Sequence, residues 1–229
     1  MTDIVVHDLI KVYKMGKVEV IALRGLDATF RGGNVTWIRG PSGCGKTTLL
    51  NLVGGLDRPT AGSIELDGQN VAQMSDADLV KYRRDNVGFI FQFFNLVPVL
   101  TAAENVDLPM RLVGVSAKAR EKRTKELLEA VGLAKRVDQR PDELSGGEQQ
   151  RVAIAVALAN DPPILLADEP SGELDSGNAA IVFDYLKMAS KERGKTVLVV
   201  SHDAHAARIA DATMDMEDGR IGAFSPRSP

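Results

Sequence analysis

The sequence predicts an α/β fold in which a mostly parallel β-sheet is flanked by helices, with an antiparallel β region near the N-terminus and a helical lobe inserted in the middle. Three observations lead to this prediction. Short apolar strand patterns alternate with helix patterns at both ends of the chain. Residues 93–144 carry helix patterns and no convincing strand. A chain of 229 residues is long enough for one large core with a smaller lobe attached.

Strand patterns dominate the start of the chain. Strands are predicted over Ile4–Tyr13, Ile21–Phe30 and Val35–Ile38, the last of them after a glycine-rich turn. Residues 47–53 follow as a helix that stops at a glycine pair, and a polar hairpin is expected around residues 67–68. The short strand over residues 35–38 is thus separated from the helix only by a glycine-rich segment, the arrangement that is typical of a phosphate-binding loop.

Capping patterns locate the later helices. A serine or threonine stands three residues before an acidic residue at three places, Ser75 with Asp78, Thr101 with Glu104 and Ser145 with Glu148. Helices are predicted over residues 76–84, 118–131, 148–159 and 179–193, with another beginning after residue 101. Residues 164–167 and 196–200 are short apolar strands, and the second suits burial on both of its faces.

Composition narrows the class of protein. The net charge is −3, whereas a nucleic-acid-binding protein usually has a basic excess, so no nucleic-acid partner is expected. A single cysteine, Cys44, excludes an intramolecular disulfide and fits a reducing compartment. No run approaches the roughly 18 apolar residues that a membrane span requires, so a membrane role is expected to need a partner.

The sequence from Gly40 to Thr47, GPSGCGKT, matches the phosphate-binding loop pattern G-x-x-x-x-G-K-[ST] in full and lies between a strand and a helix. The alternative is an ordinary glycine-rich turn, but the strand before the pattern and the helix after it favour a phosphate-binding loop. Backbone N–H groups of the loop would face phosphate oxygens, Lys46 would pair with the β and γ phosphates, and Thr47 would hold Mg²⁺. The remaining nucleotide-binding candidates are Gly40, Ser42, Gly43, Cys44, Gly45 and Thr48. Cys44 is expected to be a small filler rather than a catalytic thiol.

An apolar strand pattern ends in two acids, Asp168 and Glu169. Two solvated carboxylates at a strand end are common, and this is the alternative interpretation. Together with a phosphate loop, however, the pair predicts that Asp168 holds Mg²⁺ and that Glu169 acts as general base on the attacking water.

The stretch LSGGEQQR, from Leu144 to Arg151, resembles the signature motif of ABC ATPases, with Glu148 where glutamine is commonest. Ser145 would cap a helix whose glycine-rich start is open to an anion; a plain capping box is the alternative. The resemblance extends over nearly the whole chain. It implies that Tyr13 stacks on adenine, that Gln92 contacts Mg²⁺ and the attacking water, that His202 contacts the γ-phosphate and that Asp175 lies at a dimer interface. Without the signature, Tyr13 would be an ordinary strand aromatic, Gln92 a surface amide and His202 a helix-capping residue.

This resemblance implies a P-loop NTPase (RecA-like) fold in one ABC ATPase domain over residues 1–229, with a nucleotide-binding core at 1–92 and 145–229 and an inserted helical subdomain at 93–144. It implies ATP and Mg²⁺ as ligands and a head-to-tail dimer in which Ser145 and Gly147 of one copy cover ATP bound to the other. It also implies a separate membrane permease, which would keep the protein at the cytoplasmic face of the membrane. The apolar segment Phe93–Val99 is a candidate docking site, with packing inside the lobe as the alternative.

Within the family, the chain is most similar to ATPases of the lipoprotein-release and macrolide-export type. Two departures are Arg39, where an apolar residue is usual, and Glu173 within Ser171-Gly172-Glu173. The expected function is ATP hydrolysis that drives export or extraction of a substrate. An ABC-type ATPase that regulates a membrane-embedded signalling partner is the alternative, because it would share every motif. A nucleic-acid machine of the superfamily is disfavoured, because such proteins usually carry two ATPase domains or coiled-coil insertions.

Overall fold

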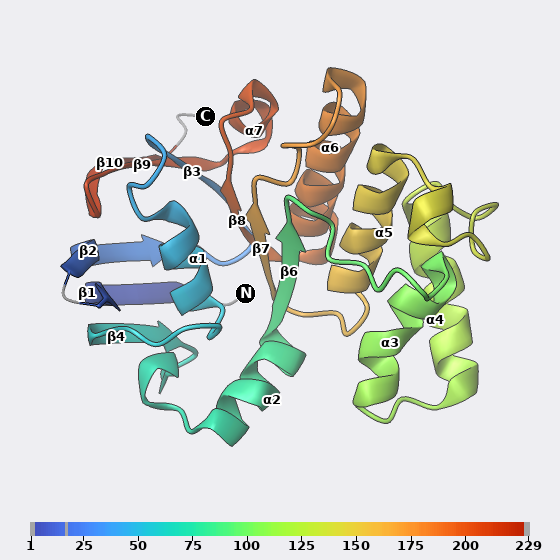
Figure 1. The fold of residues 1–229 in the computed structure, drawn as a ribbon, viewed down its shortest axis with the longest axis horizontal. Coiled ribbons are helices and arrows are strands. Elements are labelled where there is room, and N and C mark those ends of the chain that lie inside the picture. Colours follow the sequence, from blue (N-terminus) through green and yellow to red (C-terminus); the bar gives the residue numbers. More distant parts are fainter. Residues whose placement is uncertain (1–2, 17, 227–229) are drawn as a thin grey trace.

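A six-stranded, mainly parallel sheet forms the centre of the computed structural model, which describes residues 3–16 and 18–226 (Figure 1). Its strands, in spatial order β10-β9-β3-β8-β7-β6, are β10 (Arg220–Pro226), β9 (Ala212–Glu217), β3 (Val35–Arg39), β8 (Thr196–Val200), β7 (Ile164–Asp168) and β6 (Val87–Phe91). Strands β9, β3, β8, β7 and β6 run parallel, and only the edge strand β10 is antiparallel. The predicted α/β fold is therefore confirmed.

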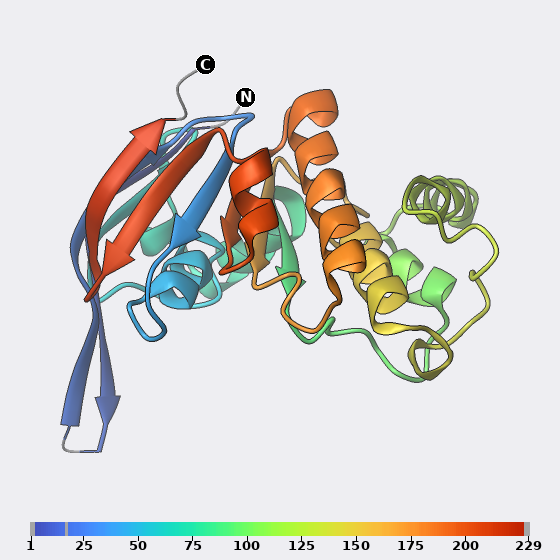
Figure 2. The ribbon, with the colours of Figure 1, turned by 90° about the horizontal axis from the view of Figure 1, so that it is seen from above.

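An antiparallel sheet of four strands, in order β2-β1-β4-β5, lies beside the central sheet. It comprises β1 (Ile4–Met15), β2 (Val18–Phe30), β4 (Ala61–Leu66) and β5 (Gln69–Asn70). Strands β1 and β2 pair over most of their length, and the Met15 end of β1 and the Val18 end of β2 extend beyond the body of the molecule (Figure 2). The turn at Asp67 and Gly68 joins β4 to β5, as predicted, and both residues have the positive φ angles that such a turn needs.

Helices cover both faces of the central sheet. Helix α1 (Lys46–Val53) packs between the two sheets, while α5 (Gly146–Ala157) and α6 (Ser176–Arg193) cover the opposite face of the central sheet. The remaining helices are α2 (Asp76–Asn86), α3 (Ala102–Leu112), α4 (Ala117–Ala130), α7 (Ala204–Ile209) and the short 3₁₀ segments Val71–Gln73 and Pro141–Glu143. Residues 93–144 contain α3, α4 and one of these 3₁₀ segments and no strand.

Alternating side chains of β7 and β8 enter two different hydrophobic cores. Leu198 and Val200 pack with α1 and the antiparallel sheet, whereas Val197 and Val199 pack with the helices of the other face. This is the two-sided burial expected of a central parallel strand. It confirms the prediction made for residues 196–200.

The predicted helix caps form. The hydroxyls of Ser75, Thr101 and Ser145 each accept a hydrogen bond from the backbone N–H three residues later. The backbone N–H groups of Thr101 and Ser145 in turn donate to the side chains of Glu104 and Glu148, which completes a capping box at both positions. Helix α6 ends at Gly194 with a φ of 65°, the left-handed conformation that favours glycine there.

Strand β6 was not predicted, because Gly88 interrupts its apolar pattern. A Cβ atom on Gly88 would lie 2.4 Å from the carbonyl oxygen of Ala157 in α5. Glycine is therefore required for close packing of β6 against α5, and it weakens the strand signal for the same reason. Helix α7 and strands β9 and β10 were also missed. Among the described residues, no helix is long and apolar enough to cross a membrane.

Candidate active site

Four segments of the predicted site leave the same edge of the central sheet. The phosphate loop follows β3, Gln92 follows β6, Glu169 follows β7 and His202 comes just after β8. These strands are parallel neighbours in the order β3-β8-β7-β6, so their carboxyl ends meet at one edge. Ligands of open α/β sheets bind at this edge.

Glycines give the phosphate loop its shape. A Cβ atom on Gly40 would lie 2.1 Å from the Met216 carbonyl oxygen, and one on Gly45, whose φ is 105°, would lie 2.6 Å from that of Ala22. Neither position tolerates a side chain, so the loop can approach its neighbours only with glycine there. Gly43 also has a positive φ, of 80°, but its Cβ would face open space. Cys44 is buried within the loop.

Lys46 turns back into the loop. Its Nζ donates to the carbonyl oxygens of Gly40 at 2.8 Å and Pro41 at 2.9 Å, and only 7% of the residue is exposed. Helix α1 has no side-chain cap and no acidic residue in its first turn. The partial positive charge of the helix N-terminus and the charge of Lys46 therefore add together, and no carboxylate in the first turn reduces their attraction for an anion.

Asp168 and Thr47 lie together beside this loop. The Thr47 hydroxyl donates to Asp168 Oδ1 at 3.2 Å. Burial raises the pKa of Asp168, and the Thr47 hydrogen bond and the Lys46 charge oppose that rise only partly. A half-buried carboxylate next to a hydroxyl is a pair of hard oxygen donors, and such a pair fits Mg²⁺.

Glu169 contacts His202 through two interactions. The His202 backbone N–H donates to Glu169 Oε2 at 3.3 Å, and His202 Nε2 lies 3.5 Å from Oε1. The backbone N–H of Glu169 donates to the Val200 carbonyl at 2.9 Å. Glu169 also has a φ of 46°, a strained conformation for a residue with a side chain. Local strain at a fixed carboxylate is typical of a functional position.

Gln92 lies at the start of the segment that leads to α3. Its Nε2 donates to Glu173 Oε1 at 3.0 Å, and its side chain packs against Gly172. The sequence pointed to Gln92 and to the unusual Glu173 separately. It did not indicate that the two residues touch, because 81 positions separate them.

Tyr13 belongs to a polar cluster that the sequence did not indicate. Its hydroxyl donates to Asp57 Oδ2 at 3.0 Å, and Lys11 binds the other oxygen of Asp57 at 2.7 Å. The Lys11 ammonium also lies 4.8 Å from the centre of the Tyr13 ring. Burial is the main cause of a raised Tyr13 pKa. The ring is thus held in one orientation by a charge network.

The signature residues form a second group around the start of α5. Ser145 caps that helix, and a Cβ on Gly147 would lie 2.3 Å from Asn178 Oδ1. Asn178 is in turn held by Asp175, which caps α6 and accepts from the Asn178 side chain at 2.6 Å. Sequence reasoning missed Asn178. Within the described residues, no hydrogen bond or ion pair joins Ser145 or Asp175 to the phosphate loop.

Arg39, the other departure from the family pattern, pairs with Asp215 of β9 and lies over the Trp37 ring at 5.2 Å. The arginine charge is therefore compensated inside the same chain.

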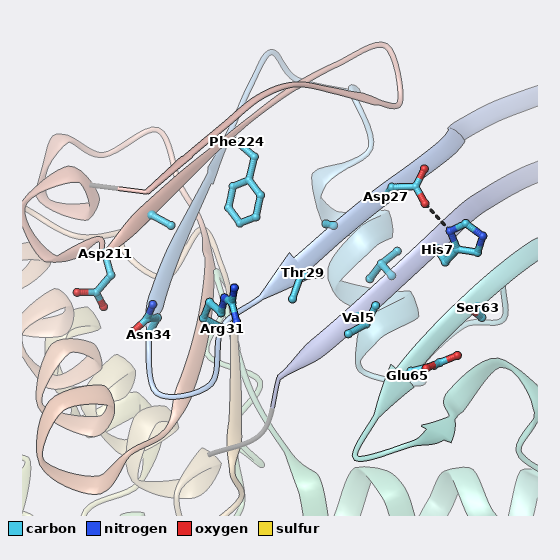
Figure 3. A pocket seen from close by; sticks show the side chains of 13 residues that line it. Val5, His7, Asp27, Thr29, Arg31, Asn34, Ser63, Glu65, Asp211 and Phe224 are labelled. Carbon is cyan, nitrogen blue, oxygen red and sulfur yellow. Dashed lines mark hydrogen bonds and ion pairs between the residues drawn. The ribbon is translucent and has the colours of Figure 1, made fainter. Parts of the chain in front are cut away.

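A hollow of about 810 Å³ lies outside the predicted site, over the antiparallel sheet and beside β10. It is lined by residues such as His7, Asp27 and Phe224 (Figure 3). It contains none of the predicted site residues.

Comparison with known proteins identifies the class. The family model described as "ABC transporter" matches residues 23–172, so the chain belongs to the ABC transporter ATPases. It is 47% identical over 220 residues to an ABC transporter ATP-binding protein of Thermotoga maritima, covering 96% of this chain and 94% of the relative. It is 46% identical to the lipoprotein-releasing system ATP-binding protein LolD of Bacteroides fragilis, covering 87% of this chain and 92% of that one.

A solved structure is similar over nearly the whole chain. It is a dimeric post-hydrolysis state of the ATP-binding cassette MJ0796 of Methanocaldococcus jannaschii, bound to ADP and Pi. The TM-score is 0.91 at 42% identity, with 99% of this chain and 100% of that chain covered. This chain is therefore an ATP-binding protein and an ATP hydrolase of the ABC type. The family prediction, including similarity to the lipoprotein-release type, is confirmed.

Proposed function

We propose that this chain works as one half of an ATP-sandwiched homodimer that powers a separate membrane permease from the cytoplasmic face of the membrane. The work done would be export of a substrate or its extraction from the membrane. The dimeric MJ0796 structures and the LolD relatives support this proposal. The observation that carries it is the convergence of Lys46, Asp168 and Glu169 at one edge of the parallel sheet.

In the proposed reaction, Lys46 and the start of α1 bind the phosphates, and Tyr13 stacks on the base. Thr47, Asp168 and Gln92 would hold Mg²⁺, which neutralises phosphate charge and helps to orient the γ-phosphate. Glu169 accepts a proton from the attacking water. His202, whose Nε2 lies 3.5 Å from a Glu169 oxygen, would hold that carboxylate and contact the γ-phosphate.

A second copy would supply the other side of the site. The Ser145 oxygen accepts a hydrogen bond from the helix backbone, and its hydroxyl could donate to an anion. Together with the N–H groups of Gly146 and Gly147, this would close over the γ-phosphate held by the partner's loop. Asp175, which ties the start of α6 to Asn178, would lie at the interface.

The proposed permease contact lies on the helical side of the molecule. Phe93 and Val99 are each 71% exposed and Leu112 is 78% exposed. A groove of about 480 Å³ beside Leu112 runs between α2, α3 and α5, and its lining includes Val80 and Arg83. An apolar groove edged by arginines suits an amphipathic helix of a membrane protein.

Size-exclusion chromatography of Glu169→Gln with ATP and Mg²⁺ tests the proposal. Removal of the base should trap ATP, so that a dimer accumulates in this variant and not in the wild type. Glu169→Gln combined with Lys46→Ala is the control, because its ATP binding should be much weaker and it should stay monomeric at ATP concentrations that dimerise Glu169→Gln alone. A Glu169→Gln protein that binds ATP but never dimerises would contradict the sandwich.

A further inference from the structure

We propose that Glu173 is a positioning residue that sets the orientation of the Gln92 side-chain amide, so that the Gln92 oxygen faces Mg²⁺ and the attacking water. This inference rests on the proposed role of Gln92. It gives a function to a residue that departs from the usual family pattern at its position.

The side chains of Gln92 and Glu173 form a direct polar contact. Gln92 Nε2 lies 3.0 Å from Glu173 Oε1. An ionised carboxylate can only accept hydrogen bonds, whereas an amide offers an NH₂ group that donates and an oxygen that accepts. Rotation of the amide by half a turn would set its oxygen against the carboxylate. Glu173 therefore selects one of the two amide orientations, the one with the oxygen turned away.

The oxygen of the Gln92 amide, and not its NH₂ group, is the atom that could bind Mg²⁺. Mg²⁺ prefers oxygen ligands, and an NH₂ group cannot replace one. A glutamine side chain without a fixed partner would spend part of its time with the wrong group toward the metal. Fixing the amide before nucleotide binds removes that cost.

Gly172 restricts Gln92 from a second side. A Cβ on Gly172 would lie 3.1 Å from the Cγ, Cδ and Nε2 atoms of Gln92. This spacing is tighter than an ordinary van der Waals contact, so even an alanine would displace the glutamine. The backbone of Gly172 and the carboxylate of Glu173 thus define one position for the amide.

The turn that carries Glu173 is itself held in place. The N–H of Gly172 donates to the Glu169 carbonyl at 3.0 Å, and that of Leu174 donates to the Ser171 carbonyl at 3.0 Å. The Ser171 hydroxyl donates to Asp203, next to His202, at 3.0 Å. Gln92 is therefore positioned by the same turn that begins at the proposed base.

Nuclear magnetic resonance of the side-chain NH₂ groups tests the contact directly. The Gln92 signal is assigned by its disappearance in Gln92→Ala. In the wild type the shift separation between its two protons should exceed that of a solvent-exposed glutamine, because only one of them faces the carboxylate. The separation should shrink to that of a solvent-exposed glutamine in Glu173→Ala, and also in Glu173→Asp, which keeps the charge but is too short to reach. An unchanged Gln92 signal in Glu173→Ala would overturn the inference.

A binding measurement tests the consequence. ATP affinity of Glu169→Gln is measured at low protein concentration with and without Mg²⁺, alone and combined with each Glu173 variant. The gain in affinity that Mg²⁺ gives should fall about threefold to tenfold in Glu173→Ala, the range expected for losing one hydrogen bond. In Glu173→Gln this Mg²⁺-dependent gain should fall less, because the new amide can still accept a hydrogen bond. Gly172→Ala should also lower the gain, without a change of charge.

Glu192→Gln is the matched control for the loss of one negative charge. It lies in the last turn of α6, a helix of 18 residues, about 25 Å from that helix's N-terminal end. It should leave both measurements unchanged. An equal Mg²⁺ effect in Glu173→Ala and the parent would contradict the inference. Failure of the sandwich would appear instead as absence of the Glu169→Gln dimer, with both of these readouts intact.

Discussion

Two helix N-termini in this molecule, those of α1 and α5, are proposed to bind ATP phosphates, and they differ in how their own chain caps them. The start of α1 has no side-chain cap and no acid in its first turn, and a buried lysine lies beside it. The start of α5 is closed by a capping box, with the Glu148 carboxylate bonded to the Ser145 N–H at 2.9 Å. A hydrogen bond from that N–H is the main reason why the pKa of Glu148 is lowered. No side chain caps the start of α1, whereas side chains of the same chain already take up part of the hydrogen-bonding capacity at the start of α5.

This difference predicts that the start of α1 binds phosphate before the start of α5 does. The α1 end has an excess of donors and one full positive charge, so it can bind phosphate within a single chain. At the α5 end a negative side chain lies close by, so it should attract a phosphate only weakly when alone. We therefore expect the α5 end to bind ATP that the partner already holds.

The largest effect should come from the α1 end. Lys46→Ala removes the loop's full charge and should weaken ATP binding by about thirtyfold or more, the range for truncating a buried, hydrogen-bonded charge. Ser145→Asp should leave ATP binding by the isolated chain unchanged. Isothermal titration calorimetry on dilute protein decides this. A comparable loss in Ser145→Asp would mean that both ends bind within one chain.

Packing at the α5 end is tighter at one glycine than at its neighbour. Gly147→Ala places a methyl group 2.3 Å from the present position of Asn178 Oδ1, so it should destabilise the fold by about 1–3 kcal/mol. Gly146→Ala meets only ordinary contacts, at 3.7 Å and beyond, and should not lower stability. Thermal unfolding compares the two, with about 2–4 °C expected per kcal/mol. Equal melting temperatures would show that Asn178 moves aside freely.

The Ser145 cap should have a smaller effect on stability. Ser145→Ala loses the hydrogen bond to the Glu148 N–H and should cost about 1 kcal/mol. Ser145→Asp should keep most of the stability, because aspartate caps helices as well as serine does. Urea unfolding of both variants checks this order. If the alanine variant is as stable as the wild type, the cap contributes nothing to the folded chain.

The smallest effect concerns Asp168. Burial raises its folded-state pKa above the ordinary value of 3.8, so ionising it costs free energy in the folded protein. This cost is absent below the ordinary pKa and reaches its full size as pH rises through the folded pKa. Asp168→Asn should therefore be more stable than the wild type at neutral pH without divalent ions, and the gap should narrow in acid. Denaturation curves across that pH range would contradict this if the gap widened in acid.

The α1 end could be predicted from the sequence because its signal is local. Eight consecutive residues, with a strand before and a helix after, define the loop and place Lys46 and Thr47. The capping box at Ser145 is equally local, since its partners are three residues apart. Local spacing fixes such features before any tertiary contact forms.

The contacts that complete the site are not local. Gln92 meets Glu173 across 81 positions, and Tyr13 meets Asp57 across 44. These partners come together only when the strands assemble, so no spacing rule points to them. Strand β6 was missed for a related reason, because Gly88 serves packing against α5 at the expense of the strand pattern.

Mixing two variants tests directly whether the α1 start of one copy and the α5 start of the other bind the same ATP. Lys46→Ala and Ser145→Asp are each placed in the Glu169→Gln background and mixed in equal amounts with ATP and Mg²⁺. Each variant alone lacks a working site, but the mixed dimer would have one site that joins an intact Lys46 to an intact Ser145 from the other copy. We predict that only the mixture forms dimers, holding one ATP per dimer. If mixing restores no dimer while the Glu169→Gln parent dimerises, the two ends do not act across the interface.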